Sequence, residues 1–277
     1  MEKRVRLVRS WIAGLAALAI LVVAGAAQGA GSHEGSDGNG SPGNPMVVPS
    51  DAMAFGRTYA EWAVVWWQWA LTNPCATNVI LDPDGRFGAD NQSGPVWFLA
   101  GGVPTTRTLG VPTGKFLFFP LINVNNDYPC PDPNFHPDPG QTLEDFLTNG
   151  NSVYPGAKFY IDPTTDLQAE IDGQSLGNLF AYRATSRLFT FTGNADLATC
   201  FDPCITGSPQ SGVSDGFWLM LTPLSAGAHT IHFFANGLFS QEETYHLTVG
   251  GHASGATPDR ATPTRTASWG KLKTLYR

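Results

Sequence analysis

Residues 58–71 read TYAEWAVVWWQWAL, and this stretch decides the fold. Thr58, followed three residues later by Glu61, makes a capping box and predicts a helix over residues 60–71. Asn73-Pro74 then ends the helix. The segment is apolar on nearly every side, with Glu61 and Gln68 as its polar side chains, so it predicts a helix buried inside the protein.

Strand patterns fill most of the remaining sequence. Residues 96–100 and 116–124 are continuous apolar runs, which are typical of strands buried on both faces. Residues 167–171 alternate in polarity, and Asp172-Gly173 after them supplies the dipeptide of a type I′ hairpin turn. Further strands are expected at residues 188–192, 217–221, 228–235 and 244–249.

The order of these elements favours an all-β architecture. A second, short helix is expected at residues 143–147, between Thr142 as its cap and Asn149-Gly150 as its stop. The pattern does not alternate helices with strands, as a parallel α/β sheet would require. We therefore predict a mainly β protein, a β-sandwich or jelly roll of antiparallel sheets packed around the buried Trp-rich helix.

Composition divides the chain into four segments. Residues 1–30 join a basic start to an apolar run and small residues, which predicts a cleaved export signal, with a membrane anchor as the alternative. Residues 31–45 predict a flexible Gly/Ser-rich leader, and residues 46–251 a single β-rich domain. Residues 252–277 form a Pro/Thr-rich tail whose basic end is either a surface-docking tag or disordered. The sequence thus predicts a secreted or periplasmic protein that is not integral to a membrane.

The charge balance restricts the partners. The chain carries 23 acidic against 16 basic side chains, a formal net charge of −7, and loss of the basic residues 1–30 would make it more negative. Such a protein does not bind nucleic acid or anionic lipid through charge. A neutral ligand such as a glycan, or a cation, fits the balance better, although acidic surfaces also serve solubility alone.

Four cysteines, Cys75, Cys130, Cys200 and Cys204, predict disulfides in an exported chain, with three connectivities open. We favour Cys200 with Cys204, which would clip a tight loop. Cys75 with Cys130 would then close a long loop worth roughly 4 kcal/mol. A zinc site is the alternative, but no histidine neighbours Cys200 and Cys204.

Several blocks of sequence resemble an uncharacterised family of secreted bacterial proteins. The blocks are Tyr59-Ala-Glu-Trp62, Trp66-Trp-Gln-Trp69 (WWQW), GPVWFLAG at residues 94–101, GKFLFFP (GKxLFFP) at residues 114–120, PLSAG at residues 223–227 and HTIH at residues 229–232. The resemblance covers most of residues 55–250 and implies export, but the family brings no established activity. Its members carry a cysteine pair where this chain has Gly88 and Leu109, which implies that the disulfides here are placed differently.

Glu61 and Gln68 are the first candidates for chemistry. A carboxylate on a buried Trp-rich helix would have its pKa raised by desolvation and could act as a general acid, with Asp82, Asp84 or Asp127 as the second carboxylate of a hydrolase. The simpler interpretation is that Glu61 completes the helix cap and Gln68 satisfies backbone groups.

The faces of tryptophan rings can stack on sugar rings, but we expect most tryptophans of this chain to pack in the core. Trp67, at the edge of the helix's main face, is the one we predict to be free for stacking. The predicted ligand-binding residues are Glu61, Trp67, Gln68, Gln92 and Asp127.

No cofactor is expected, with calcium as the alternative. Asp82, Asp84 and Asp90 form an oxygen-rich stretch, but Arg86 and Phe87 depart from the EF-hand template. A second oxygen-rich run comprises Asn123, Asn125, Asn126 and Asp127. Asx-rich turns explain both stretches more simply.

Together these features predict an exported, non-catalytic protein that binds a carbohydrate or another cell-envelope component. The competing hypothesis is a secreted polysaccharide hydrolase that uses Glu61 and an aspartate. A purely structural envelope component is a third possibility. The sequence does not predict the oligomeric state.

Overall fold

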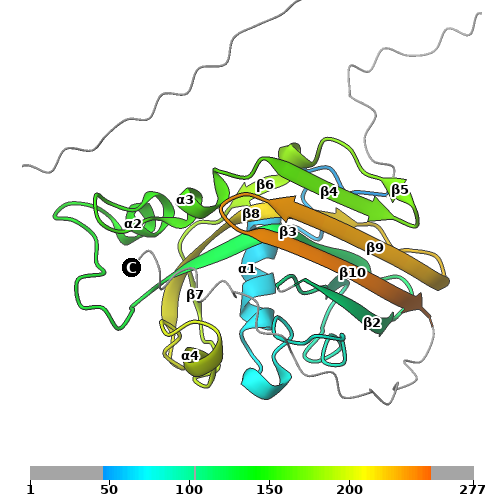
Figure 1. Cartoon of the computed structure of the whole chain (residues 1–277), viewed down its shortest axis with the longest axis horizontal. Coiled ribbons are helices and arrows are strands. Elements are labelled where there is room, and N and C mark those ends of the chain that lie inside the picture. The colour runs from blue at the N-terminus through cyan, green and yellow to red at the C-terminus, as the bar shows by residue number, and fades with distance from the viewer. Residues whose placement is uncertain (1–45, 103, 251–277) are drawn as a thin grey trace, which may run out of the picture. The chain divides into compact units, whose positions relative to one another are not determined.

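The computed structural model describes residues 46–102 and 104–250. They form a mainly β structure of two five-stranded sheets that share one hydrophobic core (Figure 1). The predicted export signal, leader and tail at residues 1–30, 31–45 and 252–277 lie outside the described residues. In the described part of the chain, no helix is long and apolar enough to cross a membrane.

The first sheet has the strand order β1-β3-β8-β6, with β7 also paired to β8. Its strands are β1 (Val96–Phe98), β3 (Phe116–Tyr128), β8 (Gln210–Leu221), β6 (Arg183–Thr185) and β7 (Phe189–Phe191). The long strands β3 and β8 pair antiparallel along nearly their whole length. They carry several of the buried polar side chains of the protein, among them Asn123, Asn125, Asp127, Ser214 and Asp215.

The second sheet has the order β2-β10-β9-β4-β5. Its strands are β2 (Thr105–Val111), β10 (Ser240–Val249), β9 (Gly227–Asn236), β4 (Asp166–Ile171) and β5 (Gln174–Ser175). Asp172 and Gly173 both have positive φ, 51° and 78°, and Ile171 pairs with Gln174, so the predicted type I′ hairpin is confirmed.

The mainly β, sandwich-like prediction is confirmed, but the sheets are mixed instead of antiparallel throughout. β1 runs parallel to β3, and β2 runs parallel to β10. The chain leaves the first sheet after β1, forms β2 in the second sheet, and returns as β3 in the direction of β1. A crossover of this kind permits the parallel pairing that a short hairpin would not.

Helix α1 (Tyr59–Ala70) confirms the predicted buried helix. Thr58 caps it, and the capping box with Glu61 is complete. The helix packs on one face of the first sheet, where Trp66 meets Trp218 of β8 with ring centroids 5.5 Å apart. Trp218 in turn stacks on Phe118 of β3 at 5.2 Å. Offset and edge contacts of this kind stabilise aromatic cores beyond the area that they bury.

The opposite face of the first sheet packs against the second sheet and two short helices. Phe119 of β3 stacks on Phe233 of β9 at 5.1 Å. The helices are α2 (Leu143–Asn149), which confirms the second predicted helix and its Thr142 cap, and α3 (Ala157–Ile161). The remaining short elements are α4 (Leu197–Cys200) and the 3₁₀ turns η1 (Cys75–Thr77) and η2 (Leu179–Tyr182).

All four cysteines form disulfides, but the expected pairing is wrong. Cys75 bonds to Cys200, and Cys130 bonds to Cys204. The folded chain places η1 beside α4, and the antiparallel β3–β8 pair brings the residues after β3 next to those before β8. Each bridge therefore joins segments that are distant in sequence, so proximity along the chain misled the prediction.

Candidate functional site

Glu61 and Gln68 lie on the exposed side of α1. Glu61 Oε2 accepts hydrogen bonds from the Thr58 backbone N–H at 2.8 Å and from the Thr58 hydroxyl at 2.9 Å. The backbone hydrogen bond is the main reason why the pKa of Glu61 is lowered, whereas a general acid needs it raised. The desolvated-acid hypothesis is therefore wrong for Glu61, and the capping interpretation is confirmed.

The amide of Gln68 has a structural partner. Its Nε2 donates to the Thr190 carbonyl of β7 at 3.0 Å. Gln92 is also engaged, since Nε2 donates to the Gly88 and Phe98 carbonyls and Oε1 accepts the Phe98 N–H. Both amides therefore anchor neighbouring backbone, which accounts for their position without a ligand.

Trp67 does not form the expected stacking platform. Its side chain is buried, with 2% of the residue exposed, and its Nε1 donates to the Ser214 hydroxyl of β8 at 3.0 Å. The edge of the helix where we expected a free ring is the edge that packs on the first sheet. A ring in this position cannot reach a sugar at the surface.

Each of the three carboxylates predicted as calcium ligands accepts hydrogen bonds from nearby groups of the chain: Asp82, Asp84 and Asp90. Asp82 accepts backbone N–H groups of Asp84 and Phe87, and Asp90 accepts from Asn73. Asp84 pairs with Arg86, whose hydrogen bond holds the pKa of Asp84 down at about 2. Within residues 46–102 and 104–250, these three carboxylates do not gather into a group suited to a metal ion.

Asp127 belongs to a buried polar row on β3 that faces α1. Asn123, Asn125 and Asp127 alternate along the strand and lie opposite Gly216, Ser214 and Gly212 of β8. All three β3 side chains are buried, Asp127 with 1% of the residue exposed. The row extends a strand that the sequence predicted to end at Val124. Buried amides and carboxylates on a core strand need a physical reason, because desolvation opposes them.

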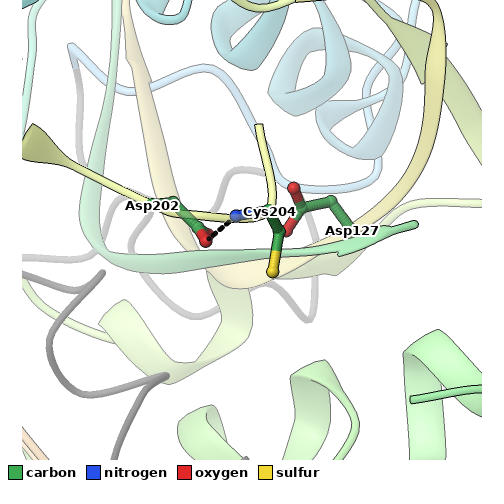
Figure 2. A group of neighbouring side chains, drawn as sticks. All are labelled: Asp127, Asp202 and Cys204. Atoms are coloured by element: carbon green, nitrogen blue, oxygen red, sulfur yellow. Dashed lines mark hydrogen bonds between the residues drawn. The ribbon is translucent and has the colours of Figure 1, made fainter. Parts of the chain in front are cut away.

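Asp127 meets a second buried carboxylate at the end of this row. Asp127, Asp202 and Cys204 place one potential ligand atom each within 4.8 Å of one another, and all three residues are buried (Figure 2). Asp127 Oδ2 accepts from Gln210 Nε2 at 3.0 Å, and Asp202 Oδ1 accepts the Cys204 N–H at 3.0 Å. Sequence reasoning singled out Asp127 but missed Asp202, because the two residues meet only through the β3–β8 register.

Another buried charge centre lies under the second sheet. Arg107 of β2 and Glu243 of β10 are almost fully buried, with Arg107 Nη1 at 3.3 Å from Glu243 Oε2. Arg107 also donates to the carbonyls of Asp82, Ala100 and Ile80 and to the Tyr245 hydroxyl. This arginine therefore ties residues 80–100 to the sheet. No pattern in the sequence indicates that Arg107 is interior.

Burial also perturbs the acid groups around Arg107. Desolvation raises the pKa of Glu243 to about 8, although the charge of Arg107 acts in the opposite direction. Desolvation likewise raises the pKa of Tyr245 to about 12. These groups are enclosed by packed residues, so their perturbed pKa values indicate a structural centre and give it no access to a substrate.

A partly exposed histidine links two turns of the second sheet. His229 Nδ1 lies 2.6 Å from Asp172 Oδ2, and Nε2 lies 2.9 Å from the Ser225 carbonyl and 3.4 Å from its hydroxyl. Burial acts to lower the pKa of His229, but the hydrogen bonds to Asp172 and Ser225 outweigh it and raise the pKa. Because the Ser225 carbonyl is the nearer partner of Nε2, the imidazole clamps the turns and does not activate the hydroxyl.

Three aromatic side chains of the described residues are exposed, and one of them, Phe55, packs its ring edge against Trp62 of α1. Phe159 of α3 and Phe180 of η2 are 44% and 50% exposed. Arg183 connects their surroundings, since Nη2 lies 2.6 Å from Asp162 Oδ1, directly after α3, and the guanidinium lies over Phe217, against which Phe180 packs. We call Phe159, Asp162, Phe180 and Arg183 the α3–η2 surface.

A shallow polar depression of about 340 Å³ lies over α2. It is lined by Thr142, Glu144, Asp145, Thr148 and Asn149. None of the predicted ligand-binding residues contributes to this depression. The five residues that we expected to form one site are therefore dispersed between the helix surface, a loop and the core.

Comparisons with known proteins do not place this chain in a family. No family model matches the chain, no curated protein matches it, and no solved structure matches it. The resemblance of its sequence blocks to secreted bacterial proteins stays an expectation from the sequence. Its function is therefore inferred from the side chains themselves.

Proposed function

We propose that this is an exported protein that binds a carbohydrate or another component of the cell envelope and does not catalyse a reaction. The observation that carries the proposal is the α3–η2 surface, where two half-exposed phenyl rings accompany a partly exposed ion pair. Export is supported by the two disulfides, which persist in oxidising compartments, and by the basic and apolar start of the sequence.

The composition of this surface suits a sugar. Aromatic rings pack against the C–H face of a pyranose, while Asp162 and Arg183 offer an acceptor and donors to hydroxyl groups. Arg183 is already held by Asp215, at 2.6 Å from Nη2 to Oδ2, so little freedom would be lost on binding. The acidic net charge of the chain also favours a neutral ligand over an anionic one.

Binding to a panel of labelled envelope glycans tests the proposal. Phe180→Ala and Phe159→Ala should each weaken retention of the bound glycan about tenfold, as expected for loss of a ring contact of 1–2 kcal/mol. Val153→Ala is the matched control, because Val153 is 70% exposed and lies outside the α3–η2 surface. Retention that is equal in all three variants would remove this surface as the site.

The same panel separates binding from hydrolysis. A binding protein retains the glycan without releasing new sugar ends. Release of such ends by the unaltered protein, lost in Glu61→Gln, would replace the binding proposal with the polysaccharide hydrolase. Neither retention nor release would favour a purely structural envelope component.

A further inference from the structure

The two halves of the α3–η2 surface have the same internal spacing. Asp162 directly follows α3, three residues after Phe159, and Arg183 directly follows η2, three residues after Phe180. Residues three apart lie on the same face of a helical turn. The ion pair of Asp162 with Arg183 joins the end of α3 to the start of β6 (Figure 1). Each half-exposed ring therefore accompanies one member of the same ion pair.

The charge of this ion pair is not balanced, because Arg183 serves two carboxylates. Its Nη2 lies 2.6 Å from Asp162 Oδ1 and also 2.6 Å from Asp215 Oδ2. The Asp215 side chain is fully buried, whereas the Asp162 side chain is 58% exposed. Two carboxylates against one guanidinium leave a formal charge of −1. A ligand reaches this charge at Asp162.

The surrounding charges also favour a cation. Lys158 of α3 contributes to the lowered pKa of Asp145 in α2, after the hydrogen bonds that Gln141 and Asn149 donate to this carboxylate. The positive charge of Lys158 therefore acts on α2 as well as on its own helix. The chain as a whole carries a formal net charge of −7, so its long-range field attracts cations and repels anions.

We infer that the glycan bound at the α3–η2 surface carries free amino groups, an inference that rests on the binding function proposed above. A protonated amine is attracted to a carboxylate and to the face of an aromatic ring within about 6 Å of the ring centroid. Asp162 supplies the carboxylate, and Phe159 and Phe180 supply the half-exposed rings. The surface thus combines both groups that recognise an ammonium ion.

The acetylated form of the same sugar lacks this match. An N-acetyl group holds its nitrogen in a neutral amide, so it brings no charge to Asp162 or to the rings. A sugar acid brings a negative charge, which the net charge of the chain repels. The ligand class that fits is therefore a glycan that contains glucosamine or another amino sugar without its acetyl group.

Retention of two labelled tetramers by the whole chain tests the inference. One consists of glucosamine, at a pH at which its amines are protonated, and the other of N-acetylglucosamine. The unaltered protein should bind the glucosamine tetramer about tenfold more tightly, as a cation–π contact and an exposed ion pair together allow. Asp162→Asn should reduce this preference to about twofold, because asparagine keeps an oxygen for Arg183 but removes the charge.

Asp90→Asn is the matched control, because it also removes one exposed carboxylate. Asp90 lies beside Trp69 near the end of α1, whereas the start of α1 lies beside η2, where Tyr59 meets Tyr182. This variant should therefore keep the full preference. If Asp162→Asn does not fold, added salt decides with the unaltered protein, since screening should shrink a preference that depends on charge.

Three results would overturn the inference and leave the proposed binding function standing. The first is an N-acetylglucosamine tetramer that the unaltered protein retains as tightly as the glucosamine tetramer. The second is a preference that survives Asp162→Asn or does not respond to salt. The third is a preference that Asp90→Asn loses to the same extent as Asp162→Asn. Retention of neither tetramer, nor of any other glycan, would instead contradict the binding function and the inference together.

Discussion

The two buried acidic centres of this protein handle charge in opposite ways. Beneath the second sheet, Glu243 lies 3.3 Å from a guanidinium that the chain itself provides. At the end of the β3–β8 row, Asp127 and Asp202 lie near each other, with neutral donors from Gln210 and Cys204. The comparison teaches that a β-rich core can hold carboxyl groups either beside an internal guanidinium or with neutral amide groups among their hydrogen-bond donors.

The first prediction concerns the centre beneath the second sheet, where a substitution removes the internal cation, the Arg107 guanidinium. Arg107→Met should destabilise the protein by about 4 kcal/mol, because it leaves several buried backbone carbonyls without a donor and removes the guanidinium beside the buried Glu243 carboxyl. Urea unfolding at pH 7 measures the loss. Arg86→Met is the control and should cost less than about 1 kcal/mol, because its ion pair with Asp84 is exposed. Equal losses would contradict a central role for Arg107.

The second prediction concerns the junction around Asp127 and Asp202. Cys130→Ser with Cys204→Ser removes a bridge between residues 74 positions apart and should cost about 4 kcal/mol on the chain-entropy model. Urea unfolding measures the loss. Cys75→Ser with Cys200→Ser removes a bridge between residues 125 positions apart and should cost slightly more, about 5 kcal/mol on the same model. A loss below about 1 kcal/mol for Cys130→Ser with Cys204→Ser would contradict a stabilising role of this junction.

The third prediction concerns how the free energy of unfolding depends on pH through the buried Glu243 carboxyl. The folded-state pKa of Glu243 is raised to about 8, so the folded protein holds a proton that the unfolded chain releases at a lower pH. Its stabilising contribution is therefore present below about pH 4.5 and is lost as the pH rises through 8, by up to about 1.4 kcal/mol per pH unit. Glu243→Gln should flatten this part of the urea-unfolding profile, whereas Glu242→Gln, an exposed neighbour, should not. An unchanged slope in Glu243→Gln would mean that Arg107 keeps Glu243 ionised.

The smallest effect is expected for the partly exposed pair of His229 and Asp172 at the surface. The raised pKa of His229 means that its pairing with Asp172 stabilises the fold fully below about pH 6.5 and less as the pH rises through the folded-state value. His229→Gln should cost less than about 1 kcal/mol at pH 5 and nothing measurable at pH 9, because the pair is partly exposed. Urea unfolding at both pH values measures the difference, and equal losses at pH 5 and pH 9 would contradict it.

Local sequence signals predicted the elements well. The capping box at Thr58, the stop at Asn149-Gly150 and the Asp172-Gly173 turn each depend on a few neighbouring residues, and all three are confirmed. Short elements such as β6 and α3 were missed, since three to five residues give too little periodicity to detect. The parallel edge pairings were missed because strand direction depends on the crossover between sheets.

The candidate site could not be predicted in the same way. Asp127 stood out because it ends a run of Asx residues, but Asp202 is brought to it by pairing between strands distant in sequence. Arg107 was overlooked, since an isolated arginine in a strand usually faces solvent. Trp67 was misjudged because helix periodicity shows which residues share a face, and it does not show which neighbour covers each edge of a helix that is apolar on all sides.

A crystal structure of the unaltered protein tests the distinction between the two centres most directly. We expect Glu243 Oε2 about 3.3 Å from Arg107 Nη1, and Asp127 Oδ2 accepting a hydrogen bond from Gln210 Nε2, with both carboxyl groups buried. An Arg107 side chain turned toward solvent, or an Asp127 carboxylate open to it, would contradict the distinction between the two centres.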